Sequence, residues 1–508
     1  MRDLLVMCRK AGPSLRSGRH LVLLFAIGCW AGPSYIPETV IAPKQRIGSP
    51  RMSDSTQRFF DSLGVARRGD TVAVMPLPVV RKSVNDATVS SLAWLDIIRD
   101  TTLVRLVETA LDQNRDLQQA IARIKEYRAY VGVARAPLLP SVTLNASESW
   151  NQISFGSLTS AYRATRFTGD LAWELDFWGR LRRGVEAANA DVGAQQAAER
   201  ATVLSLIGDV STGYLQLLEL DQERAIAEQT LSSRKTTLEI ARQRFSSGLT
   251  SELDVRQFEA QVAASAVVLV RAERALAQTA HNLNVLLGET PVAIPRGASL
   301  TDAVSSLVVP DSISAALLAR RPDVVQAERT YAAAVARIGQ ANAARWPTVS
   351  ITGSYGAQAG VPGDLLGSQA RVYQVLLGIS FPLFDNGRLA SVSAAARARA
   401  EQARASYEGV ALNALREASD ALVGIRTARD EAIALATQAT ALRQALDLAT
   451  LRYEAGIATY LELLEAQRSL FVAELALSQA QLAELTAAVQ LYKALGGSWV
   501  VAPASRPQ

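Results

Sequence analysis

Two glutamates with helical spacing stand just beyond a glycine in the stretch RYEAGIATYLELLEAQRSLF, residues 452–471. Glu462 and Glu465 are three residues apart, so they share one face of a helix, and Arg468 follows on the same face. Carboxylates held close together can exchange protons or attract cations. The alternative is that both acids belong to an ordinary solvated helix face.

The remaining composition offers little that could complete a catalytic or metal site. Beyond the first 28 residues, Cys29 is the one cysteine and His281 the one histidine, which excludes a disulfide framework, a Cys/His zinc site and a Cys/His nucleophile pair. The stretch GDLLGSQ near residue 363 lacks the lysine and the strand-to-helix context of a phosphate loop, and we interpret it as an extracellular loop between strands. We therefore expect no enzyme, no cofactor and no metal site.

The first 28 residues have the layout of a secretory signal. A basic segment ends at Arg19 and His20, and the apolar run LVLLFAIG that follows is too short to span a bilayer. Ala26, Ile27, Gly28 and Cys29 resemble a bacterial lipobox, although most lipoboxes have leucine where this chain has Ala26. Cleavage before Cys29 would leave a lipoprotein cysteine carrying diacylglycerol and an acyl chain such as palmitate. The alternative is an ordinary signal peptide followed by an incidental cysteine.

The basic isoelectric point, near 9.2, comes from this leader. Residues 1–28 hold five of the 53 basic side chains and one of the 48 acidic ones, so the rest of the chain is nearly neutral. A neutral chain lacks the positive surface that binds phosphates, and a nucleic-acid partner is not expected.

An internal repeat organises residues 97–496. Gly179-Arg180-Leu181 recurs as Gly387-Arg388-Leu389, and the turn at Gly248 recurs at Gly456, each 208 residues later. The chain therefore reads as a tandem duplication, with repeat 1 over 97–290 and repeat 2 over 291–496. A linker segment over 29–96 precedes the repeats and a tail over 497–508 follows them.

Long helices must carry the two glycine turns. Prolines are absent from residues 141–290 and 383–502, and a stripe of small apolar residues predicts one nearly straight helix from Arg388 to Tyr453. At 1.5 Å per residue this helix is roughly 100 Å long, too long for a compact domain. Each repeat is expected to begin with a helix (97–136 and 313–344) and to end with a very long helix, a glycine turn and a shorter helix.

Alternating segments between these helices predict two strands per repeat, over 139–152 and 165–178 and over 346–357 and 371–384. In FTGDLAWELDFWG, Phe167, Leu171 and Trp173 point to one side while Asp170 and Glu174 point to the other. This pattern fits a transmembrane barrel with lipid outside and water inside, and the alternative is a soluble hairpin packed on one face. Four strands cannot close a barrel, so an oligomer must supply the rest.

The combined features resemble the TolC-like outer-membrane factors, in particular the lipoprotein branch that serves multidrug efflux systems of the RND type. The resemblance rests on the repeat, on AGPSYIPE and ARRPDVVQAE, and above all on RYEAGIATYLELLEAQRSLFVAE and LYKALGGSW. It implies a mainly α fold with transmembrane β structure. In that fold a homotrimer forms a 12-stranded outer-membrane barrel, continuous with a long periplasmic α-helical barrel. The implied partners are a periplasmic adaptor (membrane fusion) protein, an inner-membrane efflux transporter and outer-membrane lipid.

The same resemblance implies a location for the gate. Gly248 and Gly456 would form the adaptor-facing periplasmic tips, and Asp254 and Tyr453 would link neighbouring helices there. The residues that would constrict the tunnel are Leu461, Glu462, Glu465 and Arg468. Members usually have aspartate where this chain has Glu465, and the lipoprotein branch often has a neutral residue at the position of Glu462.

The expected function is a passive exit duct for drugs or other small molecules in a lipid-anchored protein of the bacterial outer membrane that extends into the periplasm. An exit duct for type I protein secretion or for metal export is an alternative in the same class. A periplasmic coiled-coil scaffold that never enters a membrane is the alternative from another class.

Overall fold

The computed structural model describes residues 46–48, 100–156, 158–305 and 312–497. The predicted signal peptide with Cys29, nearly all of the 29–96 segment and the tail from residue 498 lie outside the described residues. The chain divides into two compact units. The described part of the first, called the sheet unit, is Lys125–Ala194 and Glu328–Ala405. The described part of the second, called the hairpin unit, is 46–48, 100–124, 195–305, 312–327 and 406–497.

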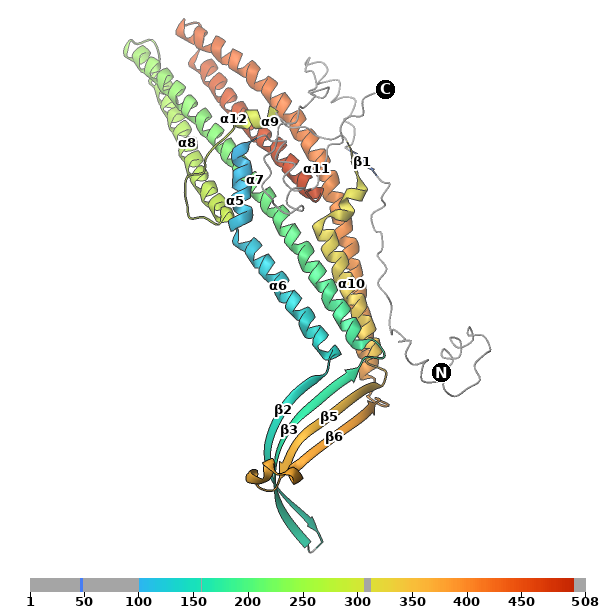
Figure 1. Cartoon of the computed structure of the whole chain (residues 1–508). Helices are drawn as coiled ribbons and strands as arrows, with labels where there is room; N and C mark the ends of the chain where they lie inside the picture. The colour runs from blue at the N-terminus through green and yellow to red at the C-terminus, as the bar shows by residue number, and fades with distance from the viewer. Residues whose placement is uncertain (1–45, 49–99, 157, 306–311, 498–508) are drawn as a thin grey trace. The chain divides into compact units, whose positions relative to one another are not determined.

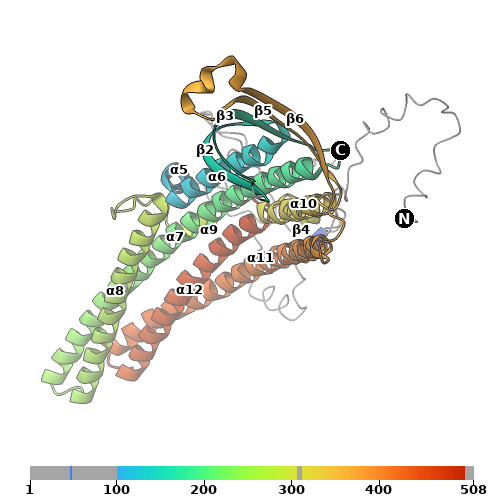
Figure 2. The same ribbon diagram turned by 90° about the horizontal axis from the view of Figure 1, so that it is seen from below.

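The sheet unit contains one four-stranded antiparallel sheet with two strands from each repeat (Figure 1). Its order is β2 (Ser141–Phe155), β3 (Leu158–Leu175), β5 (Thr348–Ala359) and β6 (Arg371–Ser380). Seen from below, the sheet is a curved layer (Figure 2). Among the described residues, β2 and β6 each pair along one edge only, so both outer edges are left without a strand partner.

The register of this sheet places apolar side chains on one face of all four strands. Leu171 of β3 lies opposite Val142 on one side and Gly353 on the other, and Gly353 in turn faces Val375 of β6. Nine large apolar side chains on this face are more than half exposed in the single chain; they are Val142, Leu144, Trp150, Phe167, Tyr355, Tyr373, Val375, Leu377 and Ile379. The opposite face is mostly polar, with Asn145 donating to Asp170 (2.6 Å).

The ends of the strands differ from those expected. β3 begins at Leu158 rather than residue 165 and stops at Leu175 rather than 178, because Asp176 accepts hydrogen bonds from the backbone N–H groups of Leu181 (3.1 Å) and Arg182 (2.9 Å) at the start of the next helix. β6 ends at Ser380 rather than residue 384, shortly before Pro382, which has no N–H for a strand ladder.

The helix that opens each repeat is also shorter than expected. The single helix expected over 97–136 is instead two helices, α5 (Thr101–Gln113) and α6 (Arg115–Arg135). Asn114 separates them, since its side chain accepts from the N–H of Leu117 (3.0 Å) and donates to the carbonyl of Leu286 (2.9 Å). In repeat 2, a helix from residue 313 is replaced by the short elements β4 (Ser312–Ser314) and η4 (Ala315–Arg320), and then α10 (Pro322–Ala343). β4 pairs with β1 (Arg46–Gly48).

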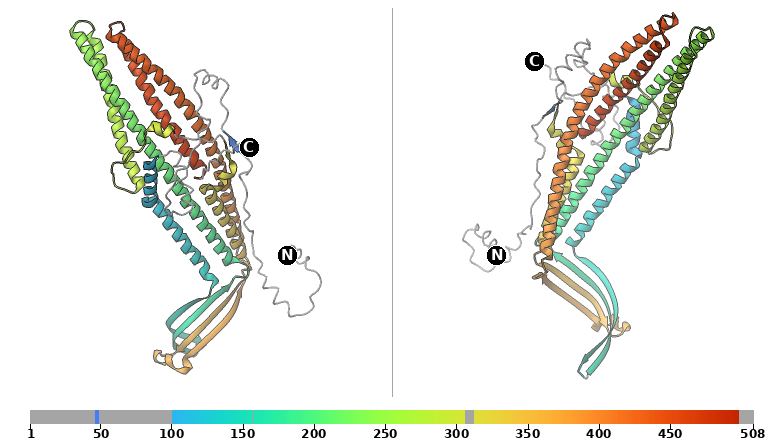
Figure 3. Two further views of the ribbon diagram at one scale, coloured as in Figure 1. Left: turned by 45° about the horizontal axis from the view of Figure 1, so that its top comes forward. Right: turned by 180° about the vertical axis from the view of Figure 1, so that it is seen from behind.

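Two helices of 67 residues each dominate the chain, α7 (Arg180–Ser246) and α11 (Arg388–Glu454). Each continues through a glycine turn into a shorter helix, α8 (Glu252–Leu287) or α12 (Tyr460–Ala494). We call α7 with α8 the first hairpin and α11 with α12 the second hairpin; both views of Figure 3 show their turns side by side. The predicted helix from Arg388 is confirmed and ends one residue beyond Tyr453. Most of its small apolar stripe is buried, although Val392 is 45% exposed.

The main core of the hairpin unit fixes the ends of the hairpins that lie away from the turns. Apolar residues of α5, α7, α8, α12 and α9 (Leu300–Ser305) form one buried cluster. Within it, the hydroxyl of Tyr214 donates to Asp100 (2.6 Å), which also accepts from the backbone N–H of Ala298 (3.1 Å). This cluster therefore anchors both hairpins and leaves their turns to be positioned by a second, smaller cluster.

Candidate functional site

The two glycine turns have the same backbone. We call residues 244–262 the first tip and residues 452–470 the second tip. Gly248 and Gly456 have φ angles of +73° and +76°, which glycine adopts without the strain that a Cβ would cause. The N–H of each glycine donates to the carbonyl three residues earlier, that of Phe245 (2.9 Å) or Tyr453 (3.0 Å). The repeat in the sequence is thus a repeat of turn geometry.

The two tips of one chain pack against each other through a small apolar cluster. Tyr453 of the second tip is 4% exposed and lies among Leu238, Ala241 and Phe258 of the first hairpin. The rings of Tyr453 and Phe258 meet edge to face with centroids 6.3 Å apart. This cluster fixes the second tip relative to the first.

Arg244 is the residue at this junction that sequence reasoning missed. Its Nη1 donates to the carbonyl oxygen of Tyr453 (2.7 Å), and its guanidinium lies 4.8 Å from the centre of the Tyr453 ring. A Cβ built on Gly456 would stand 3.3 Å from Arg244 Nη2, so the glycine also makes room for this arginine. The available signal was the 208-residue offset, which pairs Arg244 with Arg452.

Asp254 and Tyr453, expected to form links between helices, have other contacts within one chain. The carboxylate of Asp254 accepts from the hydroxyl of Thr250 and from the N–H of Ser251 (3.3 Å), while its own N–H donates to the Ser251 hydroxyl (3.3 Å). Asp254 therefore completes the capping box of α8. The Tyr453 hydroxyl is buried and has no hydrogen-bond partner among the described residues. Burial raises the pKa of the Tyr453 phenol; the positive charge of Arg244 opposes this effect and the negative charge of Asp254 adds to it.

The expected constriction residues lie together on the exposed face at the start of α12. Leu461 is 58% exposed. Glu462 forms an ion pair with Arg452 (3.0 Å), and Glu465 forms one with Arg468 (3.1 Å). The hydrogen bond from Arg468 lowers the pKa of the Glu465 carboxyl. The four predicted residues are thus brought to one exposed surface, on which each acid has an arginine beside it.

Comparison with known proteins decides the family. The family model described as "Outer membrane efflux protein" matches residues 106–289 and 313–497, which are the two repeats. The chain belongs to this family. It is 34% identical over 424 residues to the outer membrane protein OprJ of Pseudomonas aeruginosa, covering 81% of this chain and 88% of OprJ. It is 32% identical over 422 residues to the antibiotic efflux pump outer membrane protein ArpC of Pseudomonas putida, covering 82% and 87%.

The fold agrees with a solved outer-membrane channel. The structure of OprN superposes with a TM-score of 0.74 at 30% identity, covering 84% of this chain and 99% of OprN. This outer membrane efflux protein is therefore an outer-membrane channel component that extends into the periplasm, not an enzyme and not a periplasmic scaffold. The exposed apolar face of its sheet is the surface expected to meet lipid.

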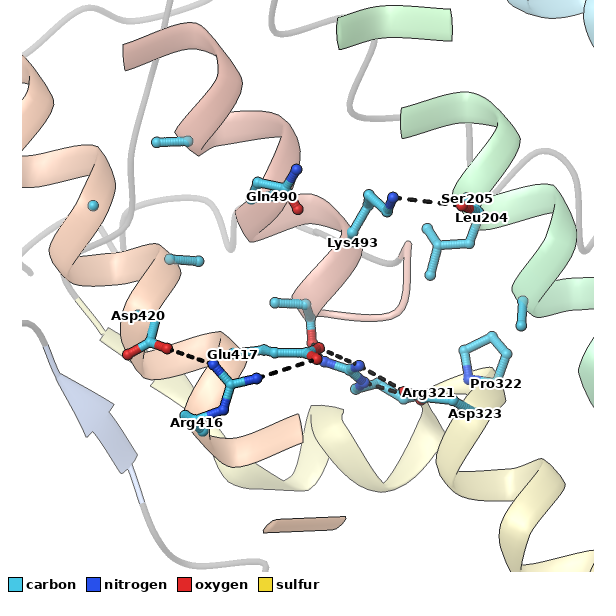
Figure 4. Close-up of a pocket in the computed structure, with 15 residues that line it drawn as sticks. Leu204, Ser205, Arg321, Pro322, Asp323, Arg416, Glu417, Asp420, Gln490 and Lys493 are labelled. Carbon is cyan, nitrogen blue, oxygen red and sulfur yellow. Dashed lines mark hydrogen bonds and ion pairs between the residues drawn. The ribbon is translucent and has the colours of Figure 1, made fainter. Parts of the chain in front are cut away.

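A groove in the hairpin unit of this efflux protein has no catalytic arrangement (Figure 4). It has a volume of about 570 Å³ and lies between α7, α11, α12 and the start of α10. Its charges are paired: Arg321 with Asp323 and Glu417 (both 2.7 Å), and Lys493 with Asp209 (3.2 Å). Within the described ranges, no group of three or more histidine, cysteine or acidic side chains could hold a metal ion.

Proposed function

We propose that three copies of the chain form a passive exit duct that carries small organic molecules through the outer membrane. The four-stranded sheet, with one apolar face and two unpaired edges, is the observation that carries this proposal. Open sheet edges are not tolerated in lipid, so neighbouring copies must pair β2 with β6. Three copies give about 12 strands, a number within the range of closed outer-membrane barrels.

The gate of this duct is proposed at the second tip. Threefold symmetry would bring Leu461, Glu462, Glu465 and Arg468 of three chains around one narrow opening. Two carboxylates per chain then form a ring of six, which attracts cations and is partly offset by the arginines beside it. The turns at Gly248 and Gly456 would meet a periplasmic adaptor protein, and an inner-membrane transporter would supply the energy.

The proposed cargo is a drug or another small organic molecule. ArpC, whose name assigns it to an antibiotic efflux pump, aligns over both repeats, and this favours organic cargo over a metal ion or a secreted protein. We also propose that Cys29 is lipidated and anchors the mature N-terminus to the membrane. Mass spectrometry of the mature protein tests the anchor: the wild-type N-terminal peptide should carry the added mass of diacylglycerol and an acyl chain on Cys29, and Cys29→Ser should lose it. A wild-type N-terminal peptide without this added mass would rule the anchor out.

Single-channel recording in planar bilayers tests the gate. Changing both Glu462 and Glu465 to alanine should raise the resting conductance, because the opening loses its charged constriction. A matched control is Glu252→Ala, which removes an exposed acid of the first tip that pairs with Arg256. An unaltered conductance in the double variant would rule out the gate. A native mass other than that of three chains would rule out the trimeric duct.

A further inference from the structure

The first tip has the same turn as the second, but among the described residues no arginine is bound to its turn carbonyl. In the second tip, the Tyr453 carbonyl accepts from both the Gly456 N–H and Arg244. In the first tip, the equivalent Phe245 carbonyl accepts from the Gly248 N–H (2.9 Å), and no side-chain donor to it is found among the described residues. A carbonyl oxygen has two lone pairs, so this one can accept a second hydrogen bond.

Two further observations distinguish the same surface of the first tip from that of the second. The Phe245 ring is 44% exposed, whereas the equivalent Tyr453 ring is 4% exposed. A Cβ built on Gly248 would meet nothing within 4 Å, whereas one built on Gly456 would approach Arg244. The first tip therefore has an unoccupied docking surface of the kind that Arg244 fills on the second tip.

Arg452 is the residue that the repeat makes equivalent to Arg244. It stands 208 residues after Arg244, on the corresponding last turn of its long helix. In the single chain its Nε contacts Glu462 (3.0 Å), and the two side chains are 52% and 45% exposed. Exposed ion pairs contribute little to stability, so Arg452 can exchange this partner at small cost.

We propose that Arg452 docks on the first tip of a neighbouring copy of this chain. Its guanidinium would donate to the Phe245 carbonyl of that copy, cover the Phe245 ring and lie against Gly248, as Arg244 does on the second tip of its own chain. The occupant is a second copy because alternating first and second tips around a closed ring put the second tip of each chain beside the first tip of the next. This inference rests on the trimer proposed above.

The docking would couple assembly to the charge at the gate. Arg452 has two alternative partners, Glu462 of its own chain and the first tip of the next chain. When the arginine sits on the neighbour, the Glu462 carboxylate loses its ion-pair partner and the ring at the opening becomes more negative. When it returns to Glu462, the ring is partly neutralised and the contact between copies is released.

Thiol cross-linking of the full chain in membrane vesicles tests the docking. Cysteines replacing Arg452 and Phe245 should be joined between chains by a short bis-maleimide, giving dimers and trimers on a denaturing gel. The control pair Arg242→Cys with Glu259→Cys, which replaces an ion pair within one chain (2.9 Å), should join within that chain and leave the mass of a monomer. The single variants Arg452→Cys and Phe245→Cys control for reaction at other cysteines.

A second arm measures how fast the trimer dissociates in detergent. Arg452→Gln should speed dissociation several-fold, while Arg224→Gln, which removes an exposed arginine of α7 that pairs with Glu228 outside both tips, should leave the rate unchanged. If the cysteine pair at positions 452 and 245 yields only monomers on the gel, the docking is overturned. It is also overturned if the Arg452→Gln trimer dissociates at the same rate as the control variant. A protein that is monomeric by native mass instead overturns the proposed duct.

Discussion

The two tips share a backbone but use their polar side chains differently. In the first tip, Asp254 completes the cap of α8 together with Ser251. At the equivalent place in the second tip, Glu462 forms an ion pair with Arg452 instead. The N-cap residue of α12, Thr459, makes no side-chain capping hydrogen bond. The acid at this place therefore caps a helix in the first tip and lies exposed beside an arginine in the second.

The difference extends along both helices. Glu259 of the first hairpin pairs with Arg242 and Arg256 on the surface, whereas its equivalent Gln467 is buried and donates to Thr237 of the first hairpin (3.0 Å). The charges of the first tip therefore stabilise that tip itself. The second tip depends on the first for its packing, and its own acids lie exposed beside arginines of the same tip.

The largest expected effect comes from removing the ring that joins the tips. Tyr453→Ala should lower the local free energy of unfolding of the second tip by about 3 kcal/mol, because a buried aromatic side chain is lost. Native-state hydrogen exchange of amides in α12 measures this change. The first tip keeps its own cap, so its amides should change much less.

Tyr453→Phe is the matched control, because it keeps the ring and removes a hydroxyl that has no hydrogen-bond partner in the described part of the chain. We expect it to be neutral or slightly stabilising. Since burial raises the pKa of Tyr453, the wild-type tip should lose stability as the pH rises above about 10, and the phenylalanine variant should not. If Tyr453→Phe lost as much stability as Tyr453→Ala, the aromatic ring of Tyr453 would not be what joins the tips.

Replacing each of the two turn glycines by alanine should give a smaller difference in stability between the tips. Both variants place a Cβ at a positive φ and should cost about 1–2 kcal/mol. Gly456→Ala should cost more than Gly248→Ala, because its Cβ also displaces Arg244. Thermal unfolding of the two variants compares them directly, and equal losses would contradict the arginine contact.

Replacing the residues at the two N-cap positions should give a still smaller difference in stability between the tips. Ser251→Ala should destabilise the first tip by about 1 kcal/mol, the usual value of a lost N-cap. Thr459→Ala should have almost no effect, since its side chain makes no capping bond. Limited proteolysis at each turn reports the local change. A larger effect at Thr459 would reverse the assignment of the capped tip.

The smallest effect concerns pH. The hydrogen bond from Arg468 lowers the pKa of Glu465, so this acid stays charged as the pH falls below the usual range of a glutamate. Arg468→Gln should therefore raise the pH at which the channel loses its cation preference. Reversal potentials measured at a series of pH values give that midpoint, and a midpoint unmoved by the variant would show that Arg468 does not act on Glu465.

The sequence predicted those features that depend on a regular spacing of residue types. The glycine turns, the 67-residue helices and the apolar face of the sheet all follow from spacing within a few residues or from the 208-residue offset. The break at Asn114 was missed because a capping side chain is hidden within an otherwise helical pattern. The Arg244 contact was missed because it joins residues far apart in the chain, and no local pattern reports which carbonyl a long side chain reaches.

The central claim is that the acids of the second tip, and not those of the first, line the opening of the channel. The most direct measurement is the reversal potential of the full-length protein in a planar bilayer under a potassium chloride gradient. The wild type should prefer cations, and Glu462→Gln combined with Glu465→Gln should abolish most of that preference. Glu252→Gln combined with Glu259→Gln in the first tip should leave it in place. An unchanged preference in the second-tip variant, or an equal loss in both, would contradict the account.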